Sequence, residues 1–148
     1  MQATDYQPLN PQVIGQAETA LGALLGPILT EAGCTFEQWV ILALTNAGGT
    51  PVDRAQLVAR VIDARKFAAA DVEAAIAKLT ADGLLSSGAG TVGLTEAGQD
   101  LRRRVRARTN EVTSGLFDFP ADDLATAGRV LAVVTDRANA FLASHATA

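Results

Sequence analysis

The chain has 148 residues and a formal net charge of −4, from 12 lysines and arginines against 16 aspartates and glutamates, and 49% of its residues are hydrophobic. A chain of this length buries roughly 70% of its unfolded surface, so we expect one domain, alone or with an appended helical arm, that needs no disulfide or metal to be stable. With one cysteine, no signal-peptide pattern and acidic residues interrupting its most apolar segment, it is expected to be a cytoplasmic protein and neither a disulfide scaffold nor a membrane protein.

The first part of the chain predicts two helices. Apolar residues recur at three- and four-residue steps over residues 11–32, as they do on a helix with one buried face, and Gly33 suits its end. Thr35 and Gln38 then have the spacing of a capping box, which predicts the start of a second helix.

The middle of the chain predicts two further helices. Thr50 followed by Pro51 is a helix-start signal, because proline at the first helical position loses no needed N–H group. Residues 63–70 are expected to form a connection, and the periodic stretch after it is closed by Gly83.

The hydrophobic period then changes from that of a helix to that of strands. Residues 84–87 and 91–94 flank the glycine-rich turn 88–90, which predicts a hairpin. Thr95 caps a fifth helix, and a sixth opens with acidic residues at Asp122 and Asp123.

A helix pair followed by a small hairpin is the winged helix-turn-helix arrangement, so the predicted fold class is mainly α with a small β-hairpin. The first, fifth and sixth helices exceed what that module needs, and a symmetric partner is the simplest way to cover their apolar faces. We therefore predict one domain over residues 1–148, in which 10–34 and 99–145 are dimerisation helices and 35–98 form the winged module.

Three segments resemble motifs of the MarR (multiple antibiotic resistance regulator) family. Residues 36–42 resemble its second-helix signature, 79–85 the end of its recognition helix, and 94–98 the junction between its wing and fifth helix. The resemblance implies a homodimeric winged-helix regulator of transcription that binds double-stranded DNA. It also implies a small-molecule pocket between the dimerisation helices and the DNA-binding module.

The sequence departs from the family pattern in three places. Ala74 stands where the recognition helix usually carries an arginine, and residues 87–93 lack the charged run usual in the wing. The connection 62–70 also looks a few residues longer than usual. Because arginines supply much of the affinity and specificity of such proteins for DNA, we expect weak, strongly salt-dependent binding.

The candidate DNA-binding residues lie in the predicted third and fourth helices, their connection and the wing. Arg65 and Lys66 precede the recognition helix and are the favoured phosphate contacts. Asp71 and Glu73 are expected to stabilise the positive end of that helix, with acceptance of a cytosine amino group by Glu73 as the alternative. The full candidate set is Arg54, Arg60, Arg65, Lys66, Asp71, Glu73, Ala74, Lys78 and Thr91.

Four other features have a structural and a functional interpretation. Cys34 is expected to be a buried filler, with a redox sensor as the alternative, and Trp39 to be a core residue that could also line a ligand pocket. The arginine cluster 102–108 fits a solvated helix face and a local nucleic-acid contact equally well. The GxGxxG pattern over 88–93 is expected to be a plain wing turn, because no βαβ unit surrounds it.

The chain shows no catalytic or metal-binding motif, so we expect neither an enzyme nor a metal or cofactor site. The predicted function is that of a homodimeric transcription regulator, a repressor or modulator, tuned by a small apolar or aromatic effector bound near Trp39 between the first, second and fifth helices. The alternative is a dimeric winged-helix interaction protein that has weak or no affinity for DNA.

Overall fold

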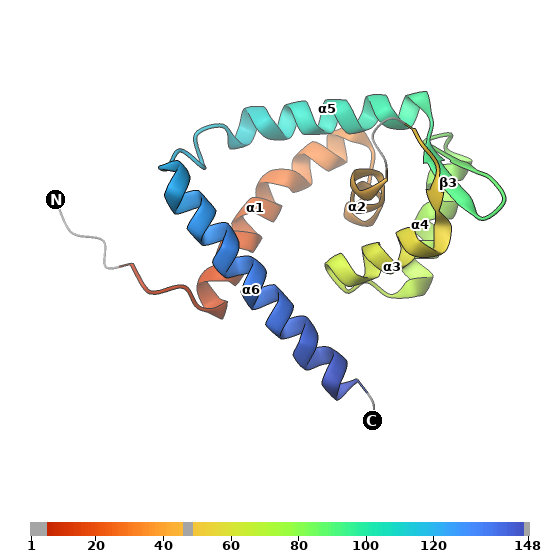
Figure 1. Ribbon diagram of the computed structural model, residues 1–148. Helices are drawn as coiled ribbons and strands as arrows, with labels where there is room; N and C mark the ends of the chain where they lie inside the picture. The colour runs from red at the N-terminus through yellow and green to blue at the C-terminus, as the bar shows by residue number, and fades with distance from the viewer. Residues whose placement is uncertain (1–5, 46–48, 147–148) are drawn as a thin grey trace. The chain divides into compact units, whose positions relative to one another are not determined.

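The computed structural model describes residues 6–45 and 49–146, and these form helices and one small antiparallel sheet (Figure 1). The chain divides into two compact units, Met1–Val112 and Thr113–Ala148. In chain order the elements are α1 (Pro11–Ala32), α2 (Phe36–Leu44), β1 (Val52–Asp53), α3 (Arg54–Arg65), α4 (Ala69–Ala81), β2 (Leu85–Ser87), β3 (Thr91–Leu94), α5 (Glu96–Thr113) and α6 (Ala121–His145). The predicted mainly helical winged helix-turn-helix is confirmed.

The ends of the first two helices follow from local chemistry. The side chain of Asn10 accepts a hydrogen bond from the Val13 N–H (3.0 Å) at the start of α1. Gly33 ends that helix in the left-handed region, with φ of 75°, where glycine carries no steric cost. Thr35 and Gln38 form the predicted capping box at the start of α2, each side chain accepting from the backbone N–H of the other.

The predicted helix start at Thr50 and Pro51 is wrong. The chain first forms the short strand β1, and α3 begins after it, where Asp53 accepts from the Gln56 N–H at 2.9 Å. Val52 pairs with Val92 of β3, so a strand contact far along the chain decides the conformation here. A proline next to a threonine carries no signal of that distant partner.

The expected long connection between the third and fourth helices is also wrong. Helix α3 continues to Arg65 and α4 starts at Ala69, which leaves residues 66–68 between them. Lys66 ends α3 in the left-handed region with φ of 58°. Hydrophobic periodicity missed both ends because residues 63–65 at the end of α3 and 69–71 at the start of α4 include no large apolar residue.

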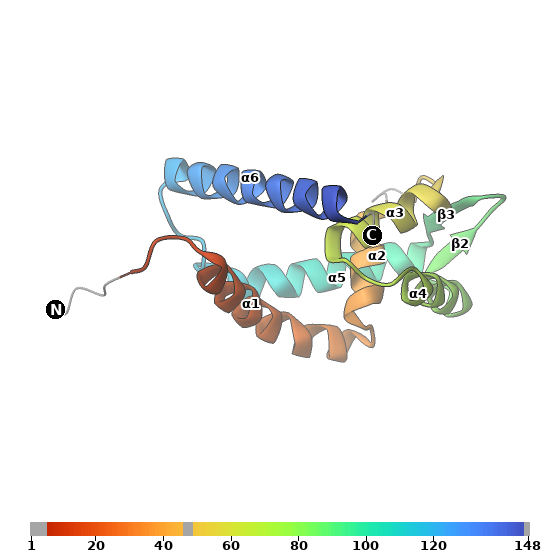
Figure 2. The same ribbon diagram turned by 90° about the horizontal axis from the view of Figure 1, so that it is seen from below.

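The sheet has strand order β1-β3-β2, so the predicted hairpin of β2 and β3 is extended by a third strand. Figure 2 shows the strands with α2, α3 and α4 gathered around the N-terminal part of α5. Their apolar faces meet in one core, which includes Ile41, Leu42, Leu57, Val61, Val72, Ile76, Leu79, Leu85, Val92, Leu101 and Val105. This packing holds α4 beside the wing.

The helices α1 and α6 contribute far less to that core. Helix α1 is long and apolar enough to cross a membrane by length and composition alone, a test that a core helix of a soluble protein also passes. It contributes Ile28 and Leu29 to the core but leaves Leu21 and Leu24 exposed. In α6, every residue of which is described from Ala121 to His145, none is buried.

Candidate nucleic-acid interface and ligand cavity

Helix α4 lies in the position of a recognition helix and exposes one face. Its apolar stripe, which includes Val72, Ile76 and Leu79, is buried in the core. The opposite face carries Ala74 at its centre, as the sequence predicts, with Lys78 one turn further on. A methyl group can contact a thymine methyl but cannot donate a hydrogen bond to a base edge.

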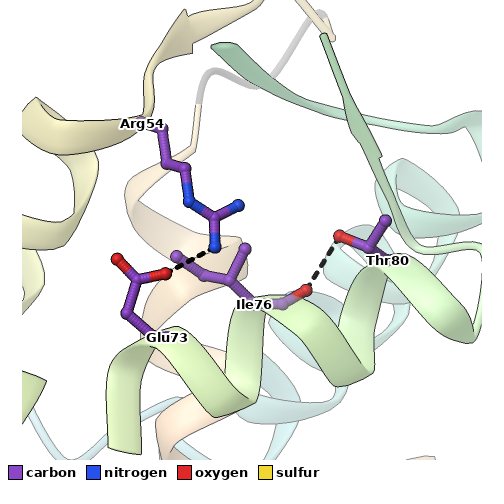
Figure 3. A network of polar contacts seen from close by, with 4 residues as sticks. All are labelled: Arg54, Glu73, Ile76 and Thr80. Atoms are coloured by element: carbon purple, nitrogen blue, oxygen red, sulfur yellow. Dashed lines mark hydrogen bonds and ion pairs between the residues drawn. The ribbon is translucent and has the colours of Figure 1, made fainter. Parts of the chain in front are cut away.

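Glu73 is engaged with the neighbouring helix rather than with the end of its own. Its Oε2 lies 2.5 Å from Nη2 of Arg54 at the start of α3 (Figure 3). Of the acidic residues predicted to stabilise the positive end of α4, Asp71 is in the first turn and Glu73 is beyond it. In this ion pair the negative charge of Glu73 offsets the positive charge of Arg54, which is one of the candidate phosphate contacts.

Two other candidate cations also lie next to acids. Lys66 Nζ donates to the Asp63 backbone carbonyl at 2.7 Å and lies 3.4 Å from its carboxylate, and Lys78 Nζ lies 3.1 Å from Asp82. Among the candidate cations, all within the described part of the chain, Arg60 has no ion-pair partner. Exposed pairs of this kind contribute about 0–1 kcal/mol to stability, so a phosphate can displace either acid at little cost.

The wing is uncharged and is tied to the start of α3. Thr91 pairs with Asp53 across β3 and β1, and the Arg54 N–H donates to the Gly90 carbonyl at 3.0 Å. Gly90 adopts a left-handed conformation with φ of 75°, as a tight hairpin turn requires. The GxGxxG segment is therefore a wing turn, as predicted.

A cavity of about 530 Å³ opens between α1, α2 and the end of α3. Its wall is mainly apolar and contains Trp39, which the sequence predicts to be a core residue with a place in a ligand pocket as the alternative. A smaller cavity of about 290 Å³ shares Leu25 and Trp39 with it and adds Arg106, Thr109 and Asn110 of α5. The lining of the larger cavity is Glu18, Leu21, Gly22, Leu25, Gly26, Leu29, Phe36, Trp39, Val40, Ala43, Leu44 and Arg65.

Arg65, a candidate phosphate contact from sequence, also lines this cavity. Its guanidinium carbon lies 4.6 Å from the centroid of the Phe36 ring, and its Nη2 lies 3.3 Å from Oε1 of Glu18. Phe67 packs edge-on against Phe36, with 6.0 Å between ring centroids, and so fixes the ring under the guanidinium. Glu18 and Arg65 are 47 positions apart, and no local pattern in the sequence connects them.

The arginine cluster of α5 is divided rather than gathered on one face. Arg102 turns towards α2, where its Nη2 donates to the Ala43 carbonyl at 3.2 Å, and burial, with a smaller effect from the charge of Arg106, lowers its pKa. Arg103 pairs with Asp100, and Arg108 lies 3.0 Å from Glu111. Arg102, Arg103 and Arg108 therefore make contacts within the protein.

Cys34 is buried, as the sequence predicts for a filler residue, and burial raises the pKa of its thiol. A raised pKa lowers the thiolate fraction that reaction with an oxidant requires, which disfavours a redox sensor. Across residues 6–45 and 49–146, no group of three histidine, cysteine or acidic side chains is placed to hold a metal ion.

The model of a helix-turn-helix family matches residues 29–148, whereas no curated protein matches the chain. The fold is similar to that of ligand-free NadR, with a TM-score of 0.74 and 20% identity over 90% of this chain and 98% of NadR. It is also similar to CouR from Rhodococcus jostii RHA1 bound to p-coumaroyl-CoA (TM-score 0.70, 16% identity, 83% of this chain and 89% of CouR). A MarR-family regulator from Rhodococcus sp. RHA1 gives a TM-score of 0.64 and 16% identity over 88% of this chain and 96% of its own.

Proposed function

The chain belongs to a helix-turn-helix family and has the winged-helix fold of MarR-type regulators, and we propose that it regulates transcription by binding double-stranded DNA as a homodimer. The observation that carries this proposal is the position of α4, which the core holds beside the wing with one face open to solvent. The proposed role is regulatory rather than enzymatic, and its place is the cytoplasm.

The proposed contacts with DNA come from α3, α4, their connection and the wing. Arg60 contacts a phosphate directly. The phosphate contacts of three other cations form after each leaves its acidic neighbour: Arg54, Lys66 and Lys78. Ala74 faces a base edge in the major groove, and Thr91 approaches the backbone from the wing. Because most of these cations exchange one partner for another, the net gain in binding free energy is small and the affinity depends strongly on salt.

The proposed effector is a small molecule with an aromatic ring, bound in the larger cavity beside Trp39. Two solved structures with this fold support the choice: one is of NadR in complex with 4-hydroxyphenylacetate, and the other is of CouR bound to p-coumaroyl-CoA. The cavity of about 530 Å³ falls within the size range of small-molecule sites, and its wall is mainly apolar, as theirs are.

A gel-shift titration against the DNA upstream of the protein's own gene tests the function. We expect a shift at low salt that weakens steeply as salt rises. Arg60→Ala should weaken binding and reduce the slope of log affinity against log salt by about 2, because a homodimer loses two phosphate contacts of about 0.9 each.

The control for this experiment is Arg129→Ala, which removes the same charge from α6, outside the winged module. It should leave the salt slope unchanged. Equal slopes for the Arg60→Ala variant and the unmodified protein would contradict the assignment of Arg60. Absence of any shift at low salt would contradict DNA binding itself.

The uncharged wing and the paired cations favour one second candidate, a homodimeric interaction protein that has kept the winged-helix scaffold without useful affinity for DNA. In that case the exposed face of α4, with Ala74 at its centre and Asp71 and Glu73 before it, contacts a protein instead of a groove. The same gel shift separates the two functions, because this candidate predicts no specific complex at any salt concentration.

A further inference from the structure

The larger cavity carries charge at two of its lining residues, Glu18 and Arg65, which form an ion pair with each other. The remaining wall is built from aliphatic and aromatic side chains and the glycines of α1. An uncharged apolar molecule could fill the space but would leave this pair untouched. A ligand with one charged group and an apolar body matches the wall more completely.

The two partners of the pair are held very differently. Arg65 lies over the Phe36 ring, which Phe67 supports from its edge, and 38% of its side chain is exposed. Glu18 makes one 3.3 Å contact and 62% of its side chain is exposed. Glu18 can therefore return to water at little cost, whereas removing Arg65 also loses a cation–π contact. The group that an entering ligand displaces is Glu18.

We propose that Arg65 is the receptor for an anionic group on the effector and that Glu18 is a built-in competitor, which occupies Arg65 until the ligand replaces it. This inference rests on the proposed effector function and specifies its chemistry. The ligand carries a carboxylate or a similar planar anion, because the guanidinium presents parallel N–H donors to such a group. Its ring lies against Trp39 in the apolar part of the cavity.

The position of Arg65 links the replacement of Glu18 by a ligand to the DNA-binding surface. Arg65 is the last residue of α3, and Lys66 to Ala68 connect it to α4. The ion pair with Glu18 links the end of α3 to α1 in the free protein. A ligand that takes over Arg65 breaks that link, and by thermodynamic linkage the effect of ligand on DNA affinity equals the effect of DNA on ligand affinity.

Three molecules of nearly the same shape test the proposal: phenylacetate, which is anionic, phenylacetamide, which is neutral, and 2-phenylethylamine, which is cationic at neutral pH. Fluorescence of Trp39, the single tryptophan, reports binding in the absence of DNA. We expect phenylacetate to bind about tenfold more tightly than the amide, which corresponds to about 1.4 kcal/mol, and the amine to bind least.

Two substitutions assign the effect to the pair. Glu18→Gln should raise the affinity for phenylacetate about threefold or more, because the competitor is gone, and leave the affinity for the amide unchanged. Arg65→Gln should remove the preference for the anion. The matched controls are Glu31→Gln on α1, which lines a different cavity, and Arg60→Gln on α3; neither should alter the binding of phenylacetate.

Three outcomes would overturn the proposal: no response of Trp39 to any probe, equal affinities for the anion and the amide, or an unchanged affinity for phenylacetate in the Glu18→Gln variant. Preference for the amine would assign the receptor role to Glu18 and would overturn it as well. Because the titration contains no DNA, failure here is distinct from failure of the gel shift.

Discussion

At the scale of single residues, the contacts at the junction between the wing and α5 explain why the motif at residues 94–98 contains threonine and glycine. The Thr95 hydroxyl donates to the Gly83 carbonyl at 2.6 Å and accepts from the Gly98 N–H at 3.1 Å, which caps α5. This draws the first turn of α5 against the chain that leads into β2. A Cβ at position 98 would overlap the carbonyl oxygen of Leu84.

Gly98→Ala should therefore lower the free energy of unfolding by about 1–3 kcal/mol, because a backbone carbonyl cannot move aside as a flexible side chain does. Urea denaturation followed by circular dichroism measures the change. The control is Gly15→Ala in α1, where a Cβ meets nothing within 4 Å among the described atoms. It should be neutral or stabilise by up to about 1 kcal/mol, since alanine is the better helix former. Equal effects of the two substitutions would contradict the close packing at Gly98.

At the scale of elements, helices α3 and α4 pack in the winged-helix arrangement, but acidic side chains offset several of the cations on their exposed surface. Arg54 begins α3 and Glu73 lies in α4, so their ion pair spans the two helices beside the exposed face (Figure 3). The side chains are 34% and 49% exposed, and the pair contributes little to stability. Its main consequence is electrostatic, because it cancels a cation that could contact a phosphate.

Glu73→Gln should raise the affinity for DNA several-fold, because it frees Arg54 and removes a negative charge that faces the phosphates. The gel-shift assay at moderate salt measures the gain. Asp71→Asn removes an acid from the same helix without freeing Arg54, so a smaller gain is expected there. The double variant Glu73→Gln with Arg54→Ala should lose most of the gain. If Glu73→Gln and Asp71→Asn act equally, the ion pair does not restrain Arg54.

At the scale of the whole molecule, the exposed apolar residues of α6 require an explanation. Leu124, Leu131, Val134, Ala138 and Leu142 recur at seven-, three- and four-residue steps and so share one face, and none of them is buried. Helix α1 exposes Leu21 and Leu24 as well. Faces of this kind are normally covered, and a second copy of the chain is the partner that we propose.

The protein should consequently behave as a dimer of twice 15.3 kDa in sedimentation or light-scattering measurements. Leu131→Glu combined with Val134→Glu should yield monomers, because two carboxylates would lose their hydration in the interface. Arg129→Glu, on the opposite face of α6, introduces one glutamate as a control and should leave the dimer intact. A monomeric unmodified protein at micromolar concentration would contradict the predicted role of these helices in dimerisation.

Sequence alone determined the features that depend on near neighbours. The capping box of Thr35 and Gln38, the helix end at Gly33 and the wing turn at Gly90 follow from hydrogen bonds and dihedral preferences within a few residues, and these predictions are confirmed. The burial of Cys34 was also predicted, because a free cysteine is among the most buried residue types. The capping box, the helix end and the wing turn together predict the observed order of helices and hairpin.

Tertiary structure decided the features in which distant segments compete with local signals. Strand β1 replaced a predicted helix start because Val52 pairs with Val92, and Arg65 entered the cavity because Phe36 and Glu18 lie beside it. An ion pair between residues 47 positions apart has no periodicity to reveal it. Local preferences are limited to a few tenths of a kcal/mol per residue, whereas the contacts made on packing are larger and exist only once the chain has folded.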